Sequence, residues 1–297
     1  MTREPTVLFC VGATKAGTSW LYEHLFAHPE CHFRSIKELH YFTLKTAAQF
    51  DGAIRATDGK IAEMQARLNA AADARKPVVA KRLADLIEWR QVLARRAIDL
   101  PAYRGFLTEG AGDARLVGDV TPAYGLLSEA GLAGLAQVAA ETRFVYLIRD
   151  PLARLWSHVR MIAARTAPDR FAQAAEAQMA AILSGDLSGE GKGIVARGDY
   201  AAILPKLARA VPGKSLLVLF QEEMMTLPGI ARLSAHLGLT PAVADLERRV
   251  HEGRALALPE ALRARALLWL RPQYEYVAAM FSVLPEAWRR NMEKGFA

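Results

Sequence analysis

A lysine and three hydroxyl-bearing residues lie in the short segment GATKAGTS, residues 12–19. The apolar run 7–11 precedes it and predicts a buried strand of a parallel sheet, while the apolar spacing of residues 19–27 predicts a helix. A loop between a strand and a helix directs backbone N–H groups toward one point, which attracts phosphates and other anions. A tight turn with a surface lysine has the same pattern, so this segment alone leaves both interpretations open.

This loop differs from the phosphate loop of nucleotide triphosphatases, whose pattern is GxxxxGK[ST]. Gly12 and Gly17 match the two glycines, but Thr18 occupies the lysine position and the lysine stands at Lys15. A triphosphatase needs its lysine on the β- and γ-phosphates and a Mg²⁺ ion on its Ser/Thr hydroxyl. The loop suits instead a single phosphate held by backbone and hydroxyl groups, with Lys15 beside it.

A second polar segment, RDPLARLWSH, covers residues 149–158 and follows the apolar run 144–148. Arg149 falls at the carboxyl end of this predicted strand, where open α/β sheets bind ligands. If a helix covers 151–164, Arg154 and Ser157 are neighbours on one helical face. An arginine with a serine hydroxyl is suited to clamp a second phosphate, although Arg149 could equally pair with a carboxylate such as Asp150.

The strands and helices that must position these segments alternate along the chain. Apolar runs at 116–119 and 215–220 predict further strands, and helical spacing appears within 52–100, 228–238 and 258–270. The glycine-rich stretch 183–198 is expected to be a mobile loop. We therefore predict an α/β fold, a single P-loop-like domain over residues 1–297 with a central parallel sheet flanked by helices.

The composition excludes several classes of protein. Of 297 residues, 52% are hydrophobic, which is too many for a disordered chain, and two cysteines cannot build a disulfide scaffold. No apolar run reaches the roughly 18 residues of a membrane span, and no convincing signal peptide is present, so a cytoplasmic protein is expected. The formal net charge of +7 suits an anionic ligand. The arginines are scattered, so no nucleic-acid partner is expected, and no metal-ligand constellation is recognisable.

Five motifs in order resemble those of sulfotransferases. Residues 14–19 resemble the 5′-phosphosulfate loop, and Arg149-Asp150-Pro151 with Ser157 resembles the 3′-phosphate motif. The segment KELHYF, residues 37–42, is similar to the one that carries a catalytic glutamate in glycan-type and many bacterial members. Residues 118–124 resemble another block of the same branch, and its later pattern is matched more loosely by residues 198–200, 216–222 and 237–239. The resemblance covers about residues 6–240, and a C-terminal helical part is expected over 241–297.

The resemblance implies transfer of a sulfuryl group from 3′-phosphoadenosine 5′-phosphosulfate (PAPS) to a hydroxyl or amine, without a metal, releasing 3′,5′-adenosine bisphosphate (PAP). Lys15 would stabilise the leaving oxygen, because the developing charge falls largely there. The donor-binding residues implied by the resemblance are Lys15, Ala16, Gly17, Thr18, Ser19, Arg149 and Ser157, with Arg254 as a further cationic contact.

Glu38 is the first candidate for the general base that takes the proton of the acceptor. Burial would have to raise its pKa for this role, whereas Lys37 would lower it by folding back. His40 is the alternative base, since the cytosolic small-molecule members use a histidine. If residues 37–42 are extended, Glu38 and His40 share one face. A solvated carboxylate paired with Lys37 or Arg34 would be the structural interpretation of Glu38.

The acceptor is less well defined. Glycan-type members often carry a lysine where this chain has Val120, so a second catalytic lysine and a long glycan acceptor are not favoured. Asp119 precedes it at the end of a predicted strand and could face the cleft. The candidate acceptors are small molecules, lipids and carbohydrates. Among them, the apolar residues within 43–115 and in the tail after residue 240 favour a lipid, a polyketide or an aromatic compound. The apolar stretch 274–288 is also compatible with a homo-oligomer.

Two other functions remain open at this point. The first is a nucleotide kinase-like enzyme that uses ATP and Mg²⁺. Thr18 argues against this function, because it occupies the position where such an enzyme needs a lysine. The second is a non-catalytic module that binds nucleotides or nucleic acid, and the positive net charge is the observation in its favour.

Overall fold

The computed structural model describes residues 4–242 and 253–296, and their strands form one parallel sheet. Its strands, in the order β2-β3-β1-β4-β5 across the sheet, are β1 (Thr6–Gly12), β2 (Cys31–His32), β3 (Leu116–Val120), β4 (Thr142–Ile148) and β5 (Leu216–Phe220). β1 lies at the centre and pairs in parallel with β3 on one side and β4 on the other. The carboxyl ends of β1, β3 and β4 therefore meet at one edge of the sheet.

Burial on both faces explains why these runs form strands of a parallel sheet. All five residues of β3 are buried, as are six of the seven residues of β4. The strands β1, β3, β4 and β5 were predicted from the continuous apolar runs at 7–11, 116–119, 144–148 and 215–220. β2 was not predicted, because its two residues, Cys31 and His32, form no apolar run and pair only with β3.

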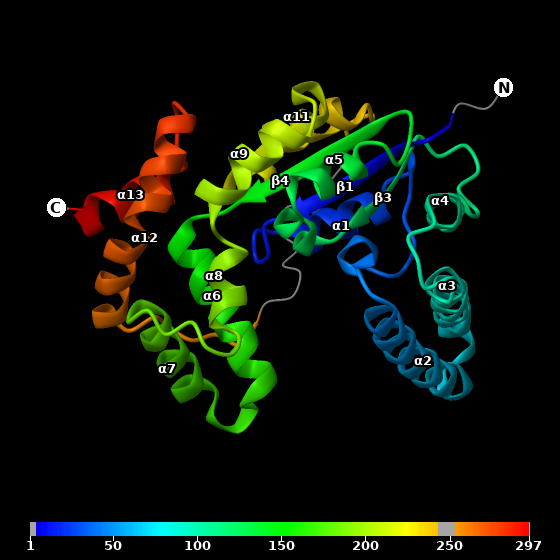
Figure 1. The fold of residues 1–297 in the computed structure, drawn as a ribbon, viewed down its shortest axis with the longest axis horizontal. Coiled ribbons are helices and arrows are strands. Elements are labelled where there is room, and N and C mark those ends of the chain that lie inside the picture. The colour runs from blue at the N-terminus through cyan, green and yellow to red at the C-terminus, as the bar shows by residue number, and fades with distance from the viewer. Residues whose placement is uncertain (1–3, 243–252, 297) are drawn as a thin grey trace.

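Helices surround the sheet. They are α1 (Thr18–Phe26), α2 (Ala47–Ala70), α3 (Lys76–Leu93), α4 (Leu100–Thr108), α5 (Glu129–Leu135), α6 (Pro151–Thr166), α7 (Phe171–Leu183), α8 (Gly191–Ala196), α9 (Tyr200–Ala210), α10 (Gln221–Met224), α11 (Leu227–Leu237), α12 (Glu260–Met280) and α13 (Glu286–Phe296). The predicted fold class is confirmed: an α/β fold with a central parallel sheet flanked by helices. Figure 1 shows the sheet in the middle, with α2 and α3 on one side and α12 and α13 on the other.

The stretch 183–198, expected to be a mobile loop from its glycines, is helical in part. α8 occupies residues 191–196, and Ile194 is fully buried there. Arg154 of α6 donates a hydrogen bond to the Ile194 carbonyl at 3.1 Å. Burial of one apolar side chain and this contact outweigh the low helix propensity of Gly191 and Gly193.

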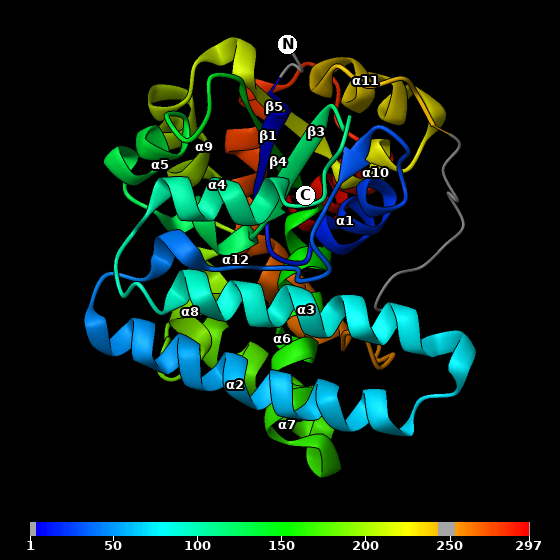
Figure 2. The same cartoon turned by 90° about the vertical axis from the view of Figure 1, so that its right-hand side faces the viewer.

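The α2–α3 pair is a separate layer that reaches beyond the sheet. The two helices run side by side in Figure 2, and Met64, Leu83 and Leu86 form their own small buried cluster. Thr46 begins α2 with a capping box in which Gln49 reciprocates. None of the helices in the described ranges is long and apolar enough to cross a bilayer.

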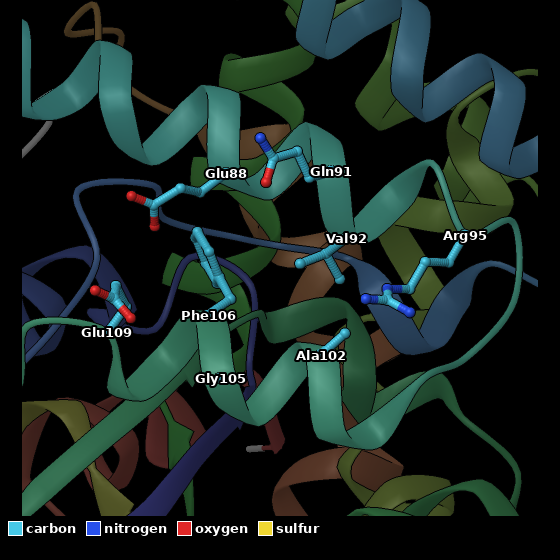
Figure 3. Close-up of a pocket in the computed structure, with 8 residues that line it drawn as sticks. All are labelled: Glu88, Gln91, Val92, Arg95, Ala102, Gly105, Phe106 and Glu109. Carbon is cyan, nitrogen blue, oxygen red and sulfur yellow. The ribbon is translucent and has the colours of Figure 1, made fainter.

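A buried ion network attaches this layer to the segment that follows β2. Arg34, 5% exposed, forms ion pairs with Asp85 at 2.8 Å and with Glu88, both on α3. Asp85 also accepts hydrogen bonds from the Ser35 backbone and hydroxyl, at 2.7 and 2.6 Å. Arg34 further lies 4.4 Å above the Phe106 ring of α4. Phe106 and Glu88 line a groove of about 320 Å³ between α3 and α4 (Figure 3). Because Arg34 is held in this way, the chain from residue 35 onward starts from a fixed point.

Candidate active site

The loop 13–17 curls between the end of β1 and the start of α1. The Ala13 backbone N–H donates to the Leu147 carbonyl at 2.7 Å, which ties the loop to β4. The first N–H groups of a helix have no partner within it, so those of Thr18 and Ser19 are available to a ligand. The expected anion-binding geometry, a strand, a loop and a helix N-terminus, is therefore present.

Two glycines make this turn possible. Gly12 has φ +149°, and a Cβ atom there would overlap the buried Tyr146 ring. Gly17, the residue before α1, has φ +88°, and its Cβ would lie 2.9 Å from Cγ of Gln221. Both positions need the conformational freedom and the small size of glycine. Lys15 also has a positive φ of 71°, and this conformation places its carbonyl within reach of Arg149.

Arg149 lies directly against the loop, although 134 positions separate it from Lys15. Its guanidinium Nη1 donates to the Lys15 carbonyl at 3.1 Å. The Tyr200 hydroxyl fixes the backbone of Arg149, accepting from its N–H at 3.1 Å and donating to its carbonyl at 2.7 Å. Asp150 then begins α6 by accepting from the Ala153 N–H at 2.8 Å. The structure thus brings together two segments that the sequence placed on separate strands.

The residues of α6 take different directions. Ser157 is half-buried, whereas Arg154 is turned into the interior, 2% exposed. Arg154 contacts Nδ1 of His158 at 3.3 Å. Arg160, which the sequence reasoning missed, donates to the Arg254 carbonyl at 3.0 Å. Its spacing of three residues from Ser157 on a helix was a signal that could have found it.

The Arg254 side chain contacts the start of α7. Its guanidinium lies 4.4 Å above the Phe171 ring and donates to the Pro168 carbonyl at 2.7 Å. These contacts occupy the side chain at the junction of α6 and α7. Its contact with the donor remains a prediction.

Positive charge gathers around Lys15. Burial lowers the pKa of Lys15, and the charges of Arg149, Arg160 and Lys37 lower it further, while Glu38 opposes them. Arg160 is affected in the same way, since burial and Arg149 lower its pKa. Lys15, Lys37, Arg149 and Arg160 thus lie near one another at the loop, an arrangement that suits a multiply charged anion.

Glu38 and His40 meet, but not on an extended strand. Both have positive φ, 64° and 56°, so the expectation of an extended segment is wrong for these residues. His40 Nε2 nevertheless lies 3.5 Å from Glu38 Oε2, and the Lys37 ammonium pairs with Oε1. Burial tends to raise the pKa of Glu38, but the contacts with His40 and Lys37 outweigh it and lower the pKa to about 2. Lys37 does fold back, and the carboxylate it contacts is a weak base.

Asp119 does not face the cleft. It is 2% exposed and accepts hydrogen bonds from the hydroxyls of Thr121, Tyr124 and Tyr103, at 2.6, 2.8 and 2.9 Å. Burial raises its pKa, and the three hydroxyls oppose that effect. Thr121 in turn accepts from the His40 backbone N–H at 3.5 Å. Asp119 therefore supports the loop that carries His40.

A second set of cations, on the C-terminal helices, was not predicted. A cavity of about 380 Å³ lies between Arg149 and Gln221 on one side and Arg263, Arg290 and Lys294 on the other. Asn291 of α13 donates to the Asp150 carboxylate at 2.9 Å, which holds α13 against the start of α6. No local motif marks these residues, because the fold alone brings them beside Arg149. Within residues 4–242 and 253–296, no cluster of His, Cys, Asp and Glu is suited to hold a metal ion.

Solved structures of other proteins share this fold. The chain is similar to a sulfotransferase from Alicyclobacillus acidocaldarius, with 18% identity and a TM-score of 0.64 over 97% of this chain and 99% of that one. It is also similar to the sulfotransferase domain of the Synechococcus PCC 7002 olefin synthase, with 16% identity and a TM-score of 0.53 over 96% and 99% of the two chains. No curated protein sequence matches it.

At these identities the solved structures establish the fold. The family follows from a sequence comparison, in which the model of the sulfotransferase family matches residues 5–187. That range is more than half of the 297 residues and contains the loop 12–19, the segment 37–42 and the stretch 149–158. The chain therefore belongs to the sulfotransferase family.

Proposed function

We propose that this protein transfers a sulfuryl group from PAPS to a hydroxyl or amine of an acceptor. The observation that carries the proposal is the group of four cations at the loop, in which burial and the charges of Arg149, Arg160 and Lys37 lower the pKa of Lys15. Such a group is costly in the free protein and is relieved by a ligand with several negative charges. PAPS, with a 3′-phosphate and a 5′-phosphosulfate, is a ligand of that kind.

The residues present fit this donor. The loop and the N-terminus of α1 offer backbone N–H groups and the Thr18 and Ser19 hydroxyls for the 5′-phosphate. Arg149 and Ser157 lie on the β4 side of the loop and suit the 3′-phosphate. When bound, PAPS supplies the sulfuryl group and a phosphate leaving group. Lys15 then stabilises the negative charge that gathers on the leaving oxygen.

We assign proton removal to His40, oriented by Glu38. A carboxylate with a pKa of about 2 accepts a proton poorly, which disfavours the initial preference for Glu38. Glu38 Oε2 faces Nε2 of His40 at 3.5 Å, which leaves Nδ1 of His40 to take the proton from the acceptor. The same carboxylate stabilises the imidazolium that forms, as an acidic residue does for a catalytic histidine in other enzymes.

Variants His40→Gln and Glu38→Gln test this assignment with PAP release as the measured rate. We expect His40→Gln to lower kcat by about 10²-fold or more, the usual contribution of a general base. Glu38→Gln should lower kcat less, because it removes only the orienting partner. PAP affinity, measured by calorimetry, should stay within about twofold in both variants, since neither side chain holds the nucleotide.

The pH dependence separates the two candidate bases. With Glu38 as the base, at a pKa of about 2, the rate would stay flat from neutral pH down to about pH 4. With His40 as the base, a fall of the wild-type rate on acidification is absent from the residual rate of His40→Gln. A variant His40→Gln that keeps the wild-type kcat would refute the assignment to the imidazole.

A further inference from the structure

A cavity of about 480 Å³ lies beside the site, between α1, the segment that follows β2, and the α2–α3 pair. Ser19 of the phosphate loop and Lys37 of the catalytic segment both line it. A cavity of this volume is of the size that holds a small organic molecule. Figure 2 shows α2 and α3 forming a layer below the sheet, and residues of both helices line the cavity.

The sheet order decides which substrate reaches this cavity. β4, which ends just before Arg149, flanks β1 on one side, and β3 with β2 flanks it on the other. A donor held by the loop, Arg149 and Ser157 therefore extends toward β4 and α6. The β2–β3 side stays free for the acceptor, and Lys37 and Ser19 connect that side to the reacting group.

The walls of the cavity combine an apolar floor with cations. Met64 and Leu86, 7% and 3% exposed, come from the cluster between α2 and α3, and Ile36 packs against the same cluster. Lys60 of α2 and Arg82 of α3 also line the cavity. Within the part of the chain that the structure describes, neither takes part in an ion pair. Arg82 is close enough to the Tyr22 hydroxyl to lower its pKa, against the larger opposite effect of burial.

Other cations that line the cavity already have a carboxylate partner. Arg67 pairs with Glu63 at 2.6 Å, and Lys37 pairs with Glu38. Glu23 also lines the wall, on α1. Among the described residues that line the cavity, Lys60 and Arg82, on adjacent helices, are therefore the cations without an ion-pair partner.

We propose that the acceptor carries an anionic group, a carboxylate or a phosphate, that Lys60 and Arg82 bind. Its apolar body lies against Met64 and Leu86, and its hydroxyl or amine points past Lys37 toward the reacting group. This inference rests on the proposed function, since it names the acceptor class of the same enzyme. It also narrows the acceptor class. Among the lipid, polyketide and aromatic acceptors that the sequence favours, it selects those with an acidic group.

The test is binding of matched ligands to the protein already saturated with PAP. The probes are 3-phenylpropionate, 2-phenylethyl phosphate and the neutral 3-phenylpropanol, titrated by calorimetry at low salt. We expect at least one of the two anions to bind about tenfold more tightly than the alcohol, from two cations contributing several-fold each. The better anion tells whether carboxylate or phosphate is the preferred group. Equal or weaker binding of both anions would overturn the proposal.

Variants locate the effect. In Lys60→Gln/Arg82→Gln the preference for the anion should disappear while binding of the alcohol stays within about twofold. The matched control is Arg55→Gln, an exposed arginine of α2 outside the cavity, which should keep the preference. An anion preference that survives in the double variant refutes the assignment to these two cations. Because PAP binding is measured first, loss of the proposed function is distinguished from loss of this inference alone.

Discussion

His158 should make the protein unusually sensitive to mild acid. The side chain lies on α6, is 3% exposed, and contacts Arg154 at 3.3 Å. Burial, followed by the charges of Arg154, Arg197 and Lys15, lowers its pKa from 6.5 to about 3. The folded protein therefore keeps this imidazole neutral at a pH where the unfolded chain protonates it.

The sign and size of the effect follow from this pKa difference. Between pH 6.5 and 3 the unfolded chain binds a proton that the folded protein does not, so stability falls as the pH falls. From pH 7 to pH 5 this one group lowers the free energy of unfolding by about 2 kcal/mol. That is a large fraction of the roughly 5–15 kcal/mol of a typical domain.

Urea unfolding at pH 7, 6 and 5 measures the effect, on the wild type and on His158→Gln. Glutamine keeps an acceptor for the Arg154 guanidinium at this position and cannot be protonated. All other titrating groups are shared, so the difference between the two pH profiles isolates His158. We expect the wild type to lose about 2 kcal/mol more than the variant between pH 7 and pH 5. Equal losses would show that His158 is protonated in the folded state and would refute the reasoning.

Two further predictions concern the phosphate loop. Lys15→Ala should lower kcat for sulfuryl transfer by about 10²-fold or more, the scale for losing one electrostatic stabiliser, and a near-wild-type rate in a PAP-release assay would exclude the role given to Lys15. Gly12→Ala should destabilise the fold by roughly 3 kcal/mol in urea unfolding, because its Cβ would overlap the Tyr146 ring at φ +149°. Gly59→Ala on α2, where a Cβ has open space, is the control and should leave stability equal or raise it by up to about 1 kcal/mol.

The main elements of the fold were predictable because each left a local pattern. The buried strands β1, β3, β4 and β5 are continuous apolar runs, and Pro151 marks the start of α6. β2 was missed because two residues are too few for any periodicity. The order of the strands, which places Arg149 beside Lys15, is a property of the whole sheet and has no local signal.

Residues of the candidate site were predictable from the sequence where their position depends only on the loop that contains them. Lys15, Gly17 and Thr18 stand where the pattern placed them, at the start of α1. The properties of Glu38 were not, since its low pKa depends on the folded positions of Lys37 and His40. Asp119 looked accessible at the end of a strand, but three hydroxyls from different elements surround it.

The C-terminal cations illustrate the same limit. Arg263, Arg290 and Lys294 occur in helices without any motif, and only packing of α13 against Asp150 brings them to the cavity beside Arg149. A sequence pattern describes neighbours along the chain, whereas an anion site collects charges from distant segments.

Calorimetric titration with PAP, and separately with ADP plus Mg²⁺, tests the central claim most directly. We predict that PAP binds without metal and more tightly than ADP with Mg²⁺, and that Arg149→Ala weakens PAP binding by about tenfold or more, as expected for a lost charge-assisted hydrogen bond. Preference for ADP with Mg²⁺, unchanged in Arg149→Ala, would contradict the proposed donor and favour a nucleotide kinase-like activity.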